Sequence, residues 1–262
     1  MAEGDRIDAD WLARHLTESP PPFAEPGEEG DAAKVLVEEL GKWAEGFALR
    51  RWGAPTESPL QLGPRGVHDE EAFTFLRAVR KNHVNVDDAG FVRVLSAKPK
   101  PNGGVYSLFS GNTYDGVPYV SLNTEYLIQF GAASELVHFW GWKPPHITVE
   151  AGEFDAVGEL AGRPALLMEA KARIDGADGL ARLLTHILEF AQASEPPRPH
   201  DTASRKYVAL LGATERNDVL LWLVAAGARW AFRATRVGER VELYEAPNPS
   251  RRAVVDITGR RR

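Results

Sequence analysis

The sequence predicts an α/β protein, because stretches with helical periodicity and stretches with strand character both recur along its 262 residues. Residues 32–52 and 180–193 each carry apolar side chains near one face of a helix. The apolar runs 154–157 and 165–168 are short and flank the turn sequence Ala161-Gly162-Arg163-Pro164, which is typical of a β-hairpin. A chain of this length can bury a substantial core.

Composition and periodicity divide the chain into three parts. Residues 1–31 are acidic and contain many prolines and glycines, so we expect a mobile segment there. Residues 32–122 are expected to form an N-terminal α+β region, and residues 123–262 to form the domain that carries the features described below. The elements expected within the second part are helices at 32–52 and 70–81 and strands at 91–95 and 117–120.

Four further elements are expected near the end of the chain. Residues 206–213 are predicted to form a strand, whereas the apolar run 218–226 fits either a strand or a short helix. Residues 230–237 and 240–245 flank Gly238-Glu239, which predicts a second hairpin with a two-residue turn.

Two carboxylates and a lysine stand out in the first hairpin. Asp155 lies in the first apolar run, and Glu169 and Lys171 follow the second. Residues two apart on a strand point to the same side, so Glu169 and Lys171 share a face. If the hairpin register brings Asp155 beside Glu169, the two carboxylates can hold a hard divalent cation such as Mg²⁺. Lys171 could then orient a water molecule and stabilise charge on a phosphoryl group.

An E-x-K pattern on a strand is by itself more often a solvated pair of charges than a catalytic site. Here the pattern follows an apolar strand with an aspartate and precedes a helix with its own apolar stripe. In this arrangement, Asp155, Glu169 and Lys171 resemble the D, E and K of the PD-(D/E)XK nuclease superfamily, with Phe154 in place of the motif's proline. The resemblance covers about residues 123–215.

A second feature of the resemblance lies upstream. Residues 131–142 are similar to the first core helix of the branch that contains Holliday-junction-resolvase-like nucleases, in which a helical glutamate precedes a GE-hydrophobic-D strand. Glu135 stands in that position before Gly152-Glu153-Phe154-Asp155, and Glu125 in the same helix is its competitor.

The resemblance implies a restriction-endonuclease-like core, a mixed sheet flanked by helices, that cuts nucleic acid with Mg²⁺ or Mn²⁺. It implies that Asp155 and Glu169 bind the metal, that the Ala170 carbonyl and Glu135 add oxygen ligands, and that Lys171 positions the attacking water. DNA is the expected substrate, so the resemblance implies an (endo)deoxyribonuclease of DNA repair, recombination or defence, and endo- versus exonuclease action stays open.

Charge is distributed unevenly along the chain. The net charge is −6, but residues 1–40 carry eleven acidic and three basic side chains, whereas residues 201–262 carry seven acidic and twelve basic ones. A basic C-terminal part suits contacts with a phosphate backbone, although ordinary solubility charge is the alternative for any single residue. The candidates for nucleic-acid contacts are Arg173, Gln192, Arg205 and Lys206. Gln192 resembles a glutamine that some branches of the superfamily carry on this helix.

Several classes of protein are disfavoured. The chain contains no cysteine, so disulfides and thiolate zinc ligation are unavailable to it. It also lacks a phosphate-binding glycine loop, a His-Glu-x-x-His motif and a Gly-x-Ser-x-Gly elbow. No apolar run is long enough to span a bilayer, and no signal peptide is recognisable, so we expect a cytoplasmic protein without membrane contact.

Partners and alternative functions stay open at this stage. A homodimer is expected if both strands of a duplex are cut with one site per chain, and residues 32–122 are a candidate surface for a protein partner. The main alternative function is a catalytically inactive module of the same fold that binds nucleic acid or a partner protein. A third is a structural subunit that recruits a separate nuclease or ATPase.

Overall fold

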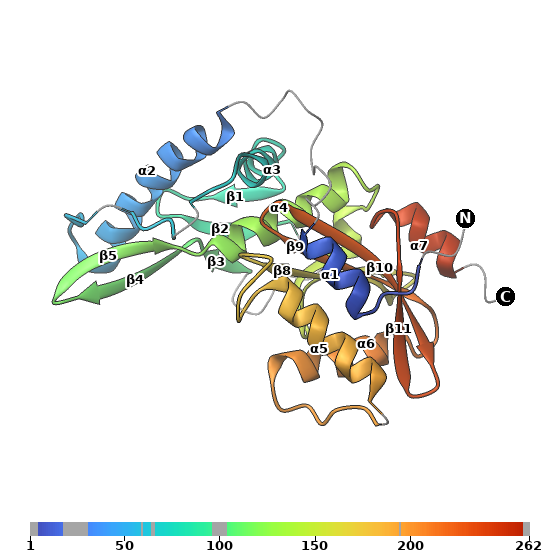
Figure 1. The fold of residues 1–262 in the computed structure, drawn as a ribbon. Coiled ribbons are helices and arrows are strands. Elements are labelled where there is room, and N and C mark those ends of the chain that lie inside the picture. The colour runs from blue at the N-terminus through green and yellow to red at the C-terminus, as the bar shows by residue number, and fades with distance from the viewer. Residues whose placement is uncertain are drawn as a thin grey trace. The chain divides into compact units, whose positions relative to one another are not determined.

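The computed structural model describes residues 5–17, 31–58, 60–63, 66–95, 104–193 and 195–258 (Figure 1). Contacts divide this part of the chain into two compact units. One contains the described residues up to 17 and those from 136 onward, and the other contains the described residues between 31 and 135. The division falls between Glu135 and Leu136, inside helix α4 (Thr124–His138), whereas the domain expected to carry the site begins at residue 123.

The unit built from residues 31–135 is α+β. Its helices confirm the two predicted from periodicity, because apolar side chains on one side of each are buried, including Leu36 and Leu40 in the first and Phe75 in the second. Its elements are α2 (Ala32–Trp52), α3 (Asp69–Arg80), β1 (Val84–Val86), β2 (Phe91–Val94), β3 (Val105–Ser107), β4 (Phe109–Tyr114), β5 (Val117–Leu122) and most of α4. The first three strands form one antiparallel sheet, and β4 pairs with β5.

The other unit is built on a six-stranded mixed sheet with the order β11-β10-β9-β8-β7-β6. Neighbouring strands are antiparallel except β8 and β9, which are parallel. The strands are β6 (Ile147–Ala151), β7 (Phe154–Leu160), β8 (Arg163–Lys171), β9 (Val219–Ala225), β10 (Ala228–Val237) and β11 (Arg240–Glu245). The α/β class predicted from the sequence is therefore confirmed.

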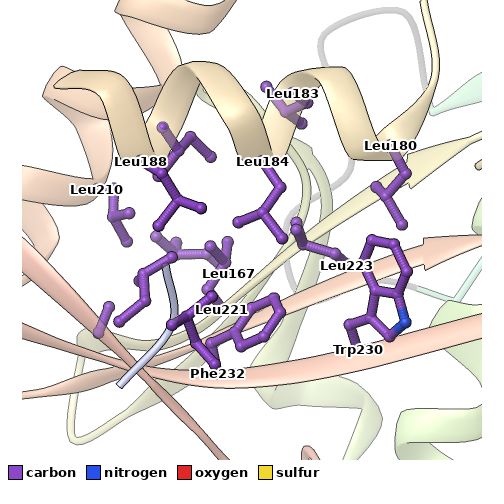
Figure 2. Packing of buried hydrophobic residues seen from close by; sticks show 14 of the residues in the cluster. Leu167, Leu180, Leu183, Leu184, Leu188, Leu210, Leu221, Leu223, Trp230 and Phe232 are labelled. Atoms are coloured by element: carbon purple, nitrogen blue, oxygen red, sulfur yellow. The ribbon is translucent and has the colours of Figure 1, made fainter. Parts of the chain in front are cut away.

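Helices α5 (Leu180–Gln192) and α6 (Thr202–Ala213) connect the two parallel strands. A parallel pair needs a crossover of this kind, because a tight turn can join only antiparallel strands. Figure 2 shows Leu180, Leu184 and Leu188 of α5 directed toward the sheet. The buried cluster on this face also contains side chains of β8, β9, β10 and α6, namely Leu167, Leu221, Leu223, Trp230, Phe232, Tyr207 and Leu210.

The opposite face of the sheet is also covered. Short helix η1 (Pro144–His146) precedes β6, and helix α7 (Arg251–Thr258) contacts β9. The buried Trp142 lies against Gly158 of β7, where an added Cβ atom would come within 2.7 Å of the indole ring. The indole nitrogen of Trp142 donates a hydrogen bond to the carbonyl of Pro249 (2.9 Å). All seven residues of β9 are buried, as expected for a central strand with both faces covered.

One predicted strand is wrong, because residues 206–213 belong to helix α6. A capping box begins this helix, in which the Asp201 carboxylate accepts a hydrogen bond from the backbone N–H of Ser204 (2.7 Å) and the Ser204 hydroxyl accepts one from the N–H of Asp201 (3.0 Å). These bonds satisfy N–H groups that the first helical turn leaves without partners. The apolar run Tyr207 to Leu211 alone does not distinguish a helix from a strand.

The expected mobile segment 1–31 is also ordered in part. Residues Ala9–Thr17 form helix α1, and the buried side chains of Ile7, Trp11 and Leu12 join the core cluster. The backbone N–H of Ile7 donates to the carbonyl of Leu243 in β11 (2.8 Å). Three apolar side chains within six residues are enough to dock this short segment, despite its acidic surroundings. Residues 18–30, the proline-rich remainder, lie outside the described chain.

The remaining predictions for the end of the chain are settled by pairing. The ambiguous run 218–226 is strand β9, and β10 and β11 form the predicted hairpin around Gly238-Glu239. Within the described ranges, no helix combines the length and the apolar character that crossing a bilayer requires.

Candidate functional site

The hairpin expected to carry the site is formed by β7 and β8. Leu160 pairs with Arg163 across a two-residue turn. The turn residues Ala161 and Gly162 have positive φ angles of 51° and 74°, as a type I′ turn requires. The turn predicted from residues 161–164 is therefore confirmed.

A β-bulge just after Gly158 sets the register that brings the two carboxylates together. Beyond the bulge, Ala156 pairs with Met168, and extending this register by one residue places Asp155 opposite Glu169. Without the extra residue of the bulge, Asp155 would lie opposite Met168, because a slip of one residue exchanges the two faces of a strand.

Asp155 is held by the backbone of the neighbouring strand. Its Oδ2 atom accepts a hydrogen bond from the N–H of Ala170 (2.6 Å). The pKa of Asp155 is raised from 3.8 to about 7, chiefly by burial and also by the negative charge of Glu169, against the opposing effects of the Ala170 N–H, Lys206 and Lys171. The side chain therefore changes its charge near neutral pH in the metal-free protein.

Glu169 is fully buried and lies between two ammonium groups. Its Oε2 atom accepts a hydrogen bond from Lys206 Nζ at 2.5 Å, and its Oε1 atom lies 2.8 Å from Lys171 Nζ. The contact of Oε1 with Lys171 is an ion pair. The side chain of Lys171 is 18% exposed, whereas that of Lys206 is only 7% exposed. Lys171 is thus the member of this group that reaches solvent.

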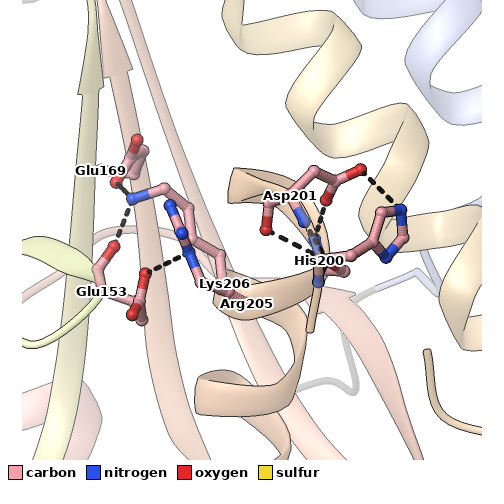
Figure 3. A network of polar contacts seen from close by, with 7 residues as sticks. Glu153, Glu169, His200, Asp201, Arg205 and Lys206 are labelled. Carbon is pink, nitrogen blue, oxygen red and sulfur yellow. Dashed lines mark hydrogen bonds and ion pairs between the residues drawn. The ribbon is translucent and has the colours of Figure 1, made fainter. Parts of the chain in front are cut away.

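Lys206 is a site residue whose position the sequence reasoning missed. It was expected to contact nucleic acid from the surface, but it projects from α6 into the interior, as Figure 3 shows. Its ammonium also donates to the carbonyl of Glu153 and lies 5.2 Å from the centre of the Phe154 ring. The capping sequence Asp201-x-x-Ser204 was the available signal. It predicts a helix, in which Lys206 shares an inner face with Ala203 and Leu210.

Arg205, the neighbour of Lys206, points outward. Its Nε atom lies 3.3 Å from Glu153 Oε2, and the two side chains are 49% and 40% exposed. Solvent screening makes such a pair a weak contributor to stability. The expected contact of Arg205 with nucleic acid stays a prediction.

The oxygen donors suit a small site for a hard cation. Asp155 and Glu169 supply two adjacent carboxylates, and Mg²⁺ commonly takes only one or two carboxylates while it keeps several water molecules. Within the part of the chain that the structure describes, no group of three or more His, Cys, Asp and Glu side chains is placed to hold a metal ion. Asp155 and Glu169 are therefore the two carboxylates that would hold a metal here, with water or backbone carbonyls able to add further oxygen ligands.

The remaining predicted residues are not brought to this group by any contact described. Glu135 is buried in α4, on the side of the division that belongs to the other unit, and Glu125 is half-buried near the start of the same helix. Arg173 pairs with the exposed Asp178 at 3.4 Å, and Gln192 is exposed at the end of α5. Their proposed roles stay predictions, as does that of the Ala170 carbonyl.

Comparisons with known protein families, with curated proteins and with solved structures find no match to this chain.

Proposed function

We propose that this protein is a nuclease that hydrolyses phosphodiester bonds in nucleic acid, with DNA as the substrate, and that it uses Mg²⁺ or Mn²⁺. The observation that carries the proposal is the convergence of Asp155, Glu169 and Lys171 at one end of the β7–β8 hairpin. The order of elements also supports it. A helix precedes the hairpin, and helix α5 follows it and packs against the sheet, as the resemblance to the PD-(D/E)XK superfamily implied.

The residues divide the chemistry between them. A divalent cation held by Asp155 and Glu169 would polarise the phosphoryl group and favour ionisation of water. The Ala170 N–H keeps the Asp155 carboxylate directed toward the hairpin partner. Lys171 combines a contact with Glu169 and partial exposure, so its ammonium can orient the attacking water and stabilise the negative charge that develops on the phosphoryl oxygens.

The alternative function is a module of the same fold that binds nucleic acid or a partner protein without cutting. The observation that favours it is the pairing of Glu169 with both lysines. When both carboxylates are ionised, they balance the two ammonium groups without a metal. A buried group of this kind can be retained as a structural feature.

A cleavage assay separates the two functions. Supercoiled plasmid, linear duplex, single-stranded DNA and RNA are each incubated with the protein in Mg²⁺, Mn²⁺ or EDTA. Under the proposal, DNA is cut only with metal, and Asp155→Asn and Lys171→Met each lower the rate by at least about 100-fold. The control Glu153→Gln removes a partly exposed carboxylate two residues from Asp155 and retains activity. Absence of cutting by folded wild type, or equal cutting by all variants, contradicts the proposal.

A further inference from the structure

The proposed chemistry gives no role to Lys206, which is nevertheless the most buried cation of the site. Its side chain is 7% exposed, and its ammonium contacts Glu169 Oε2, the Glu153 carbonyl and the face of Phe154. Burying an ammonium is costly unless other groups replace its hydration. Two oxygens and an aromatic ring do so here, and together they form a socket for a cation inside the protein.

This socket overlaps the proposed metal site. Glu169 is needed as a metal ligand, yet its Oε2 atom already lies 2.5 Å from Lys206 Nζ. A divalent cation bound to Oε2 would compete directly for that oxygen. If the divalent cation bound to Oε1 instead, it would still share the Glu169 carboxylate with the Lys206 ammonium. The two positive charges would repel each other, because burial weakens screening by solvent.

The charge balance leads to the same conclusion. When Asp155 and Glu169 are ionised, their charges cancel those of Lys171 and Lys206. Adding a divalent cation leaves an excess of two positive charges in a region of low exposure, whereas without Lys206 the excess would be one.

We infer that Lys206 is a built-in competitor of the metal: its ammonium neutralises Glu169 in the metal-free protein and weakens the binding of a divalent cation there. The inference rests on the proposed function, because it assumes that Asp155 and Glu169 bind a metal. It assigns Lys206 to control of metal occupancy, in place of the surface contact with nucleic acid that its position in the sequence suggested.

The test measures Mn²⁺ affinity by isothermal titration calorimetry, without nucleic acid, for wild type, Lys206→Met and Lys206→Gln. Methionine keeps most of the length of the side chain without its charge, and glutamine also keeps a donor for Glu169. Removing one buried like charge is expected to tighten Mn²⁺ binding by about tenfold or more in both variants. Arg205→Met is the matched control. It removes a cation from the next residue but on the exposed side, and it should change the affinity by less than about twofold.

Thermal unfolding with and without Mn²⁺ provides a second readout, because at a fixed concentration a ligand that binds more tightly stabilises the folded state more. The increase in Tm caused by Mn²⁺ should be larger in Lys206→Gln than in wild type, whatever the Tm of the metal-free variant. Equal or weaker Mn²⁺ binding by both folded Lys206 variants, with wild-type binding abolished by Asp155→Asn, overturns only this inference. If no protein binds Mn²⁺ in a manner that depends on Asp155, the metal-dependent function and this inference both fail.

Discussion

Strands β8 and β9 are parallel neighbours, yet at paired positions of the sheet β8 carries charged side chains and β9 carries apolar ones. Glu169 of β8 pairs with Leu223 of β9, and Lys171 pairs with Ala225. Both Glu169 and Leu223 are fully buried. At the same level of the sheet, one strand therefore buries an apolar side chain and the other buries a carboxylate that is paired with lysines.

Buried ion pairs are often no better for stability than apolar residues of similar volume, although breaking one is costly. Buried charges at such a position are consistent with the proposed metal site, and the stability of variants tests how far they also serve the fold. Four substitutions or conditions test this comparison of the two strands.

The largest effect is expected from moving a charge onto the apolar strand. Leu223→Glu places a carboxylate beside Glu169 without a lysine of its own, and it should lower the free energy of unfolding by about 4–5 kcal/mol. Leu223→Met is the control, with an expected loss below about 1.5 kcal/mol. Urea unfolding followed by far-UV circular dichroism measures both. Similar losses for the two variants would show that charge is tolerated on either strand.

Removing the Glu169 charge from β8 should lower the free energy of unfolding somewhat less than Leu223→Glu does. Glu169→Leu deprives Lys206 of its carboxylate and is expected to destabilise the protein by about 3 kcal/mol. The double variant Glu169→Leu/Lys206→Met removes both buried charges and should recover to within about 1 kcal/mol of wild type. The same urea titration measures this coupling. Additive losses in the double variant would mean that the two side chains do not depend on each other.

The third effect is a dependence of stability on pH in the metal-free protein. The pKa of Asp155 is raised from 3.8 to about 7 in the folded state, so the folded protein binds more protons than the unfolded chain between these values. Stability relative to Asp155→Asn should therefore be greatest at low pH and should fall as the pH rises toward 7, by at most about 1.4 kcal/mol per pH unit.

Unfolding in EDTA at pH 5, 6, 7 and 8 measures this difference. A difference between wild type and Asp155→Asn that stays constant or grows with pH would show that Asp155 keeps an ordinary or lowered pKa.

The smallest effect concerns the register of the hairpin, since the pairing of β7 with β8 shifts by one residue after Gly158, whereas β8 and β9 pair without a shift. Gly158→Ala adds a methyl group that would meet the Trp142 ring at 2.7 Å, and it should cost about 1–2 kcal/mol. The variant should also lose Mn²⁺ affinity if the bulge shifts. Gly212→Ala in α6, where nothing lies within 4 Å of an added Cβ atom, is the control. Equal stability of the two variants would show that β7 accommodates the added group.

The sequence by itself determined the local parts of this protein. Helices with a clear apolar stripe, such as α2 and α5, and hairpins with a glycine in the turn were predicted close to their observed bounds, because periodicity and turn chemistry act over a few residues. For the same reason the spacing of Asp155, Glu169 and Lys171 identified the candidate site.

The tertiary structure alone decided which side chains surround this candidate site. The register shift after Gly158 is a property of the pairing of β7 with β8, and Trp142 lies against Gly158 at this point. Lys206 reaches Glu169, which lies 37 positions earlier in the sequence, and Trp11 and Leu12 of α1 join a core built by distant segments. Contacts between distant segments depend on how the whole unit packs, and no pattern within a short window of sequence contains that information.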